Sequence, residues 1–132
     1  MINEAYIETR KKLDTLFEKF LEDTVAYRMT QNLNPNLTDK AISEIKNAML
    51  FALDTARLMI DRGSNVYIAV GQAFNQAHNY LYGRLINYPK EIRDYVSMLG
   101  SYFIMEYLGY FELALFRQKK SGRSTRRAEV AL

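Results

Sequence analysis

The stretch AISEIKNAMLFALDTARLMIDRG, residues 41–63, carries apolar side chains at intervals of three and four residues. They are Ile42, Ile45, Met49, Leu53, Ala56 and Ile60. Such spacing places them on one side of an α-helix. Gly63 follows Arg62 and suits a helix end, because glycine readily adopts positive φ. The stretch therefore predicts a long amphipathic helix whose apolar face must pack against other elements.

Similar patterns flank this stretch. We expect one helix over residues 4–30, where a second apolar stripe consists of Leu13, Leu16, Phe17, Phe20, Leu21, Val25 and Met29. The segment QNLNPNLTD, residues 31–39, interrupts the pattern and offers Thr38 as an N-cap. After Gly63, Ser64 or Asn65 can cap a third helix with a face rich in alanine. Few prolines and glycines occur, so the sequence predicts an all-α fold in one compact domain.

The C-terminal third begins with Pro89, which suits the first turn of a short helix that we expect to end at Gly100. The next stretch, SYFIMEYLGYFELALF, residues 101–116, is almost uniformly apolar and too short to span a membrane. A small bundle covers only part of such a surface, so we expect the remainder to contact another subunit or lipid. The candidate contact residues are Tyr102, Phe103, Tyr107, Tyr110, Phe111 and Phe116.

The positive charge is concentrated near the end of the chain. Residues 117–127, RQKKSGRSTRR, hold six Lys or Arg and no acid, whereas residues 1–116 hold twelve basic and fourteen acidic side chains. A segment of this composition buries too little apolar surface to fold alone. It suits phosphates of nucleic acid or of lipid head groups, bound through counterion release without sequence readout. A solubilising end with no partner is the alternative.

Nothing in the sequence predicts catalysis. The chain has no cysteine, and its one histidine, His78, has no histidine or carboxylate three or four residues away. The common nucleotide, zinc and hydrolase motifs do not occur. We therefore expect no enzyme, no metal site and no cofactor. The N-terminus, MINEAYIETRKK, is unlike a signal peptide, so we expect synthesis in the cytoplasm.

Two stretches carry a resemblance to a known family. LDTARLMIDRG, residues 53–63, and NYPKEIRDYVSMLGS, residues 87–101, resemble the major coat proteins of rod-shaped and filamentous archaeal viruses, the rudiviruses and lipothrixviruses. Those coats share an Ala-Arg pair before a helix-ending Gly, a helix of small and aromatic residues, and a Pro-acid-Ile turn that opens the next helix. The matching positions are Ala56, Arg57, Gly63, Pro89, Glu91, Ile92 and Asp94.

The resemblance implies a four-helix-bundle body, residues 38–118, with an N-terminal helical arm, residues 1–37, and a basic tail, residues 119–132. Such coats wrap linear double-stranded DNA, in A-form, in a helical filament, so the partners expected are DNA and other copies of the chain or a paralogous coat protein, within a virion. The apolar segment near the C-terminus fits the enveloped branch, whose members also meet envelope lipid. The expected DNA-binding residues are Arg10, Lys11, Lys12, Lys19, Arg28, Arg57, Arg62, Lys119, Lys120, Arg123, Arg126 and Arg127.

Two other resemblances give rival functions. EYLGYFELALFRQKKSG, residues 106–122, is similar to the last helix of the small helical subunit of type III CRISPR effector complexes, which would imply RNA binding. ARLMIDRGSNVYIAVGQAFNQA, residues 56–77, is similar to helical ribonucleases of the HEPN type. Their chemistry needs an Arg four to six residues before a His. Here Arg84 follows His78 instead, which argues against an enzyme.

Overall fold

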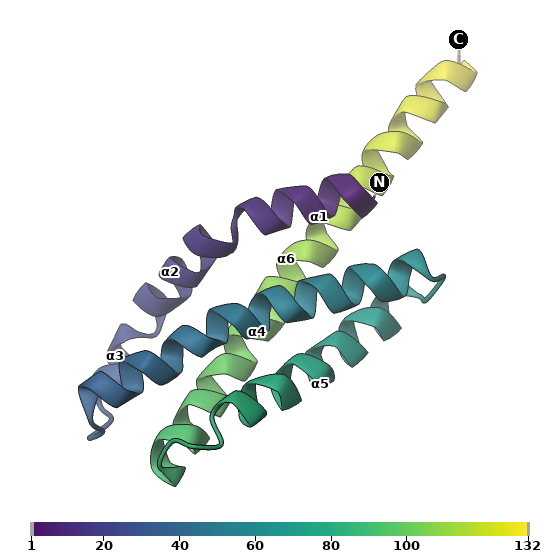
Figure 1. Cartoon of the computed structure of the whole chain (residues 1–132). Helices are drawn as coiled ribbons and strands as arrows, with labels where there is room; N and C mark the ends of the chain where they lie inside the picture. Colours follow the sequence, from purple (N-terminus) through teal and green to yellow (C-terminus); the bar gives the residue numbers. More distant parts are fainter. Residues whose placement is uncertain (1, 132) are drawn as a thin grey trace.

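The computed structural model describes the backbone of residues 2–131 and the side chains of residues 2–118. Over residues 2–131 the chain forms six α-helices and no strand, so the predicted all-α fold is confirmed (Figure 1). The helices are α1 (Ile2–Lys11), α2 (Leu13–Asp23), α3 (Val25–Met29), α4 (Pro35–Asp61), α5 (Val66–Arg84) and α6 (Lys90–Ala131).

Helix α4 lies at the centre of the packing. It forms a hairpin with α5, and α6 runs beside both, while α1 and α2 lie against α4 and α6 (Figure 1). The bundle therefore has four packed members, and one of them is the α1–α2 segment. Residues 2–23, within the segment expected to be an arm, supply this member.

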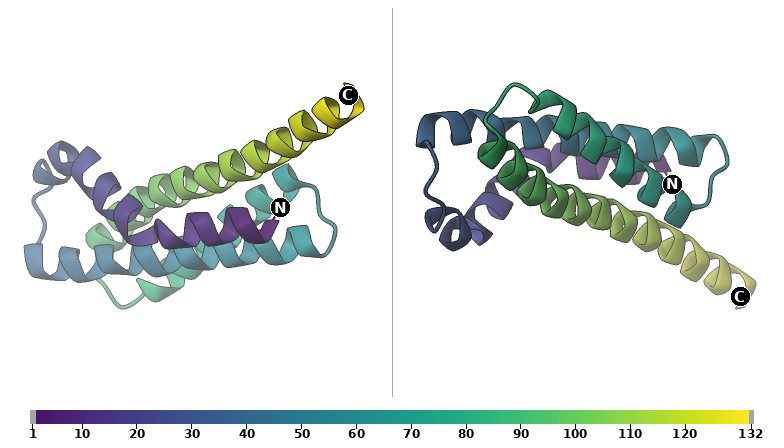
Figure 2. Two further views of the ribbon diagram at one scale, coloured as in Figure 1. Left: turned by 90° about the horizontal axis from the view of Figure 1, so that it is seen from above. Right: turned by 90° about the horizontal axis from the view of Figure 1, so that it is seen from below.

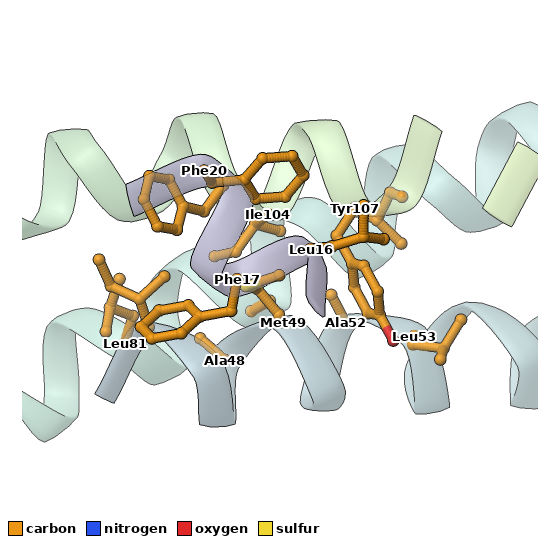
Figure 3. Packing of buried hydrophobic residues seen from close by; sticks show 14 of the residues in the cluster. Leu16, Phe17, Phe20, Ala48, Met49, Ala52, Leu53, Leu81, Ile104 and Tyr107 are labelled. Atoms are coloured by element: carbon orange, nitrogen blue, oxygen red, sulfur yellow. The ribbon is translucent and has the colours of Figure 1, made fainter. Parts of the chain in front are cut away.

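The core forms where these four members meet. Phe17 and Phe20 of α2 belong to one buried cluster with Met49 of α4 and Ile104 of α6, and Leu16 of α2 lies on the side of Tyr107 (Figure 3). Phe17 and Phe20 both pack edge-to-face on Phe103, at centroid distances of 5.8 Å and 5.4 Å. The apolar stripe read from residues 41–63 forms the α4 side of this core, except that Ile60 is only partly buried.

Local sequence signals explain where α4 and α5 begin and end. The Asn34 side chain caps α4 by accepting a hydrogen bond from the Leu37 amide at 3.1 Å, so the expected cap at Thr38 is wrong and the helix begins one turn earlier. Pro35 takes the first helical position, where no amide hydrogen is needed. Gly63 follows α4 with φ of 97°, and Asn65 caps α5.

The helix expected over residues 4–30 is three helices instead. Lys12 separates α1 from α2, and Thr24 separates α2 from α3. Near the first break, the buried Tyr107 hydroxyl donates to the Thr9 carbonyl at 2.8 Å, and the Lys12 amide bonds the same carbonyl. Near the second, the Thr24 hydroxyl donates to the Phe20 carbonyl. Hydrogen bonds to helix carbonyls bend helices in this way.

Gly100 does not end a helix, so the helix end predicted at this residue is wrong. Helix α6 continues through it, so the expected short helix and the aromatic segment are one element. A Cβ atom at Gly100 would lie 2.2 Å from Leu81 Cδ2 and 3.4 Å from Ile45 Cγ1. The glycine is there because α5 and α4 approach α6 closely, and not because the backbone needs positive φ.

Candidate self-association surface and nucleic-acid contacts

The aromatic segment divides into a buried side and an outer side. Phe103, Tyr107 and Phe111 are completely buried within the chain, so the expectation that these three contact a partner is corrected. The reason is that α1, α2, α4 and α5 all pack against α6. Tyr110 is partly buried, and its hydroxyl accepts a hydrogen bond from Lys12 Nζ at 2.5 Å. Among the expected contact residues, Tyr102 and Phe116 remain exposed.

The outer side of α6 is an apolar surface that other helices leave uncovered. We define the α6 outer face by five large side chains exposed by 40–62%: Met98, Tyr102, Met105, Leu113 and Phe116. Their spacing places them on one side of the helix, together with Gly109. Both views in Figure 2 show α6 along one edge of the molecule. Sequence reasoning missed Met98, Met105 and Leu113, because it weighed aromatic residues and could not tell which side of the helix would be covered.

A hollow lies on each flank of the α6 outer face. The first, of about 410 Å³, lies between α6 and the α2–α3 junction and is lined by Asp23, Thr24, Tyr27, Met98, Leu99 and Tyr102. The second, of about 340 Å³, lies between α6 and α5 and is lined by Val70, Gly71, Phe74, Met105, Leu108, Gly109 and Glu112. Both linings are mostly apolar. Exposed apolar surface of this kind marks sites of protein or membrane contact.

Two glycines open the second hollow. A Cβ atom built at Gly71 or at Gly109 meets no atom within 4 Å, so neither glycine is required by packing within the chain. Each glycine lowers the stability of its helix by roughly 1 kcal/mol relative to alanine. Glu112 is the acidic residue of the hollow, and partial burial raises the pKa of its carboxyl. Apolar surroundings therefore disfavour its charged form.

The expected DNA-binding residues whose side chains are described fall into two groups. Arg10, Lys11 and Lys19 of the α1–α2 segment are exposed and make no ion pair with the side chains of residues 2–118. Arg62, at the end of α4, is likewise exposed and unpaired within that range. These four are free to meet phosphate. Asp14 and Glu18 lie among the first three on the surface, so the α1–α2 segment presents mixed charge.

The second group is engaged within the chain. Lys12 bonds Tyr110 and lies 3.6 Å from Glu8, and the Tyr110 hydrogen bond raises the pKa of Lys12. Arg57 donates to Asn3 at 2.9 Å, and its guanidinium carbon lies 4.2 Å from the Tyr6 ring centroid. Arg28 donates to the Leu21 carbonyl at 2.7 Å. These three cations are therefore engaged in contacts within the fold.

The predicted tail contacts Lys119, Lys120, Arg123, Arg126 and Arg127 lie outside the residues whose side chains are described. The side chain of Arg117, the first residue of the basic segment, is described and pairs with Glu8 of α1 at 3.1 Å. This ion pair brings α1, with its exposed Arg10 and Lys11, next to the start of the basic segment.

Other kinds of site have less support. His78 stacks against Phe74, with centroids 6.2 Å apart. Within the described part of the chain, no cluster of three or more His, Cys, Asp or Glu side chains is placed to hold a metal ion. No helix there is long and apolar enough to cross a bilayer.

Comparison with known proteins adds no relative. Neither the family models, the curated proteins nor the solved structures contain a match to this chain.

Proposed function

We propose that this protein is a structural coat subunit that polymerises into a helical filament around linear double-stranded DNA, as in rod-shaped and filamentous archaeal viruses. The observation that carries the proposal is the α6 outer face, which leaves five large apolar side chains exposed directly before the segment that holds the whole net positive charge. Copies of the chain cover this face, and the basic segment neutralises DNA phosphates.

The charge distribution favours a polyanion of uniform charge over a shaped ligand. Six cations are interspersed with Ser, Thr and Gly over residues 117–127, and the exposed Arg10 and Lys11 lie beside its start. Contacts of this kind position a protein on a phosphate backbone without reading bases. The bundle itself holds fourteen acids against twelve bases over residues 1–116, so nonspecific attraction to phosphate comes from the basic segment.

The DNA contacts that we propose differ in weight from residue to residue. Arg10, Lys11, Lys19 and Arg62 contact phosphate together with the basic segment. The α1–α2 segment keeps its place in the bundle, because releasing it would expose Leu13, Leu16, Phe17 and Phe20 to water. Burying each of these side chains is worth roughly 1.5–3 kcal/mol, which opposes unfolding of the segment as a free arm.

A lipid surface is the second candidate partner, favoured by one observation. The α6 outer face is apolar and precedes the basic segment directly, the order found in helices that lie in a membrane interface beside anionic head groups. The two acids on or beside that face, Glu106 and Glu112, weaken this alternative, since neither suits acyl chains or an anionic surface.

A competition experiment tests the proposed function. The protein is titrated at equal salt with two linear duplex DNAs of unrelated sequence, a single-stranded RNA and vesicles containing anionic phospholipid. We expect equal affinity for the two duplexes and weaker binding to the RNA and the vesicles. Preference for RNA would support the rival RNA-guided complex, preference for vesicles would support the lipid partner, and either result would refute the coat proposal.

A further inference from the structure

A pocket away from the α6 outer face lies where α3, the loop of residues 30–34 and the first turns of α4 meet Tyr95 of α6. We call it the α3–α4 pocket. Its volume is about 190 Å³. An apolar cavity of roughly 150 Å³ holds benzene, so this pocket suits a ligand of about eight non-hydrogen atoms. Its apolar walls come from α3, the loop and α4, and they are Met29, Leu33, Pro35 and Ile42.

Two buried hydrogen-bond donors of this pocket have no acceptor. Arg28 and Tyr95 both line the pocket, and Tyr95 is only 6% exposed. Neither Arg28 Nε nor the Tyr95 hydroxyl has a hydrogen-bond partner in the described part of the chain. Burial raises the pKa of the Tyr95 hydroxyl and the nearby charge of Arg28 lowers it, so the two groups are close. Because an unpaired buried donor destabilises a fold, we expect an acceptor from outside the chain here.

The charges that line the pocket select the kind of acceptor. Arg28 contributes a positive charge, and Asp39, in the second turn of α4, contributes a negative one. Asp39 is exposed and makes no ion pair with the side chains of residues 2–118. The donors of the other polar lining residues, Gln31 and Thr38, are bonded within the chain. A ligand with one negative and one positive group is complementary to this lining, whereas a dianion would be repelled by Asp39.

We propose that the α3–α4 pocket binds a small amino acid with an apolar side chain. The carboxylate of the ligand accepts hydrogen bonds from Arg28 Nε and from the Tyr95 hydroxyl, its ammonium group lies near the Asp39 carboxylate, and its side chain rests on the apolar walls. L-Valine has the size expected from the volume. The site goes beyond the coat function proposed above, because its lining includes no residue of the α6 outer face and none of the four exposed cations proposed to contact DNA.

An NMR titration of the whole chain tests this proposal, with the methyl signals of Leu33 and Ile42 as reporters of the pocket. L-Valine is compared at neutral pH and equal ionic strength with isovalerate, which lacks the ammonium group, and with isobutylamine, which lacks the carboxylate. We expect saturable shifts with valine. Each analogue should bind roughly tenfold more weakly, because it loses one charge-assisted hydrogen bond.

Two substitutions assign the roles of the polar residues. Tyr95→Phe should keep the fold, because the lost hydroxyl has no partner in the described chain, and should weaken valine binding roughly tenfold. Tyr80→Phe removes the hydroxyl of a partly buried tyrosine outside the pocket, so this control should bind valine as wild type does. Asp39→Asn should remove the preference for valine over isovalerate.

Three results would overturn the proposal. Absence of saturable shifts with valine would leave water as the partner of the two donors. Equal affinity of wild type for valine and isovalerate would show that the pocket does not recognise an ammonium group. Valine binding by Tyr95→Phe that equals binding by Tyr80→Phe would place the ligand elsewhere.

Discussion

Three glycines of the bundle have different physical roles. Gly63 ends α4 with positive φ, and this role follows from its sequence position after the apolar stripe. Gly100 lies against Leu81 and Ile45 in the middle of α6. Gly109 faces open space on the opposite side of the same helix. Sequence reasoning took Gly100 for a helix end, because a helix-helix approach has no local signature.

These roles predict opposite effects of one substitution. Gly100→Ala should lower the free energy of unfolding by about 1–3 kcal/mol, because the new methyl overlaps the completely buried Leu81. Gly109→Ala should raise it by roughly 0.5–1 kcal/mol through helix propensity alone. Urea denaturation of both variants at low protein concentration checks the pair. Equal effects of the two substitutions would contradict the packing described.

Glu112 predicts a pH dependence of stability. Partial burial raises the pKa of its carboxyl above the ordinary value of 4.5, so the folded chain binds the proton more tightly than the unfolded chain. This contribution to stability is complete below pH 4.5 and is lost as the pH rises through the raised pKa. Glu112→Gln should therefore gain stability relative to wild type on raising the pH, measured by thermal unfolding in a pH series. Glu106→Gln, which removes an exposed carboxyl of the same helix, is the matched control.

Helix α6 shows where sequence reasoning reaches its limit. The caps and breakers of α4 and α5 are local, so the Gly63 end was predicted correctly and Asn65 was one of the two caps expected for α5, although the cap of α4 is Asn34 and not Thr38. The break at Lys12 was not, because it coincides with a hydrogen bond between Tyr107 and Thr9, 98 residues apart. The burial of Phe103 could not be predicted either, since periodicity gives no information about which neighbours cover an apolar helix.

The α6 outer face predicts a variant that gains stability and loses self-association. Gly109→Gln should stabilise the isolated chain by about 0.5–1 kcal/mol, since glutamine is the better helix former and meets open space. The glutamine side chain should also prevent a second copy from packing on the α6 outer face. Analytical ultracentrifugation should therefore show monomers where wild type shows dimers. Gly83→Gln, at another open glycine on α5, should gain the same stability and keep the dimer. A dimer with Gly109→Gln would show that copies meet elsewhere.

In the whole molecule, the surface proposed for self-association and the net positive charge lie on different segments of the chain. Its bundle is nearly neutral and slightly acidic, and its net charge of +3 arises at one end. The fold class and the basic segment were both evident from the sequence, because hydrophobic periodicity and charge can be read directly from the order of the residues. The α6 outer face was not, because it depends on how α1, α2, α4, α5 and α6 share one core.

This separation predicts the salt dependence of DNA binding. Neutralising about ten phosphates, six with residues 117–127 and four with Arg10, Lys11, Lys19 and Arg62, should give a slope of about −9 for the logarithm of affinity against the logarithm of salt concentration. Replacing Lys119, Lys120, Arg123, Arg126 and Arg127 with Gln should reduce the slope by half, to about −4.5. Lys40→Gln, an exposed cation elsewhere, should leave it unchanged. Fluorescence anisotropy with labelled duplex checks the slopes. An unaltered slope in the five-residue variant would place the phosphate contacts on the bundle.

The most direct measurement is electron microscopy of the protein mixed with linear duplex DNA, wild type beside Met105→Glu/Leu113→Glu. Both replaced side chains are exposed by about 60%, so the variant should fold as wild type does. We expect regular filaments of uniform width with wild type, and DNA bound without regular filaments with the variant. Wild-type protein that leaves the DNA bare and stays monomeric at high concentration would contradict the account.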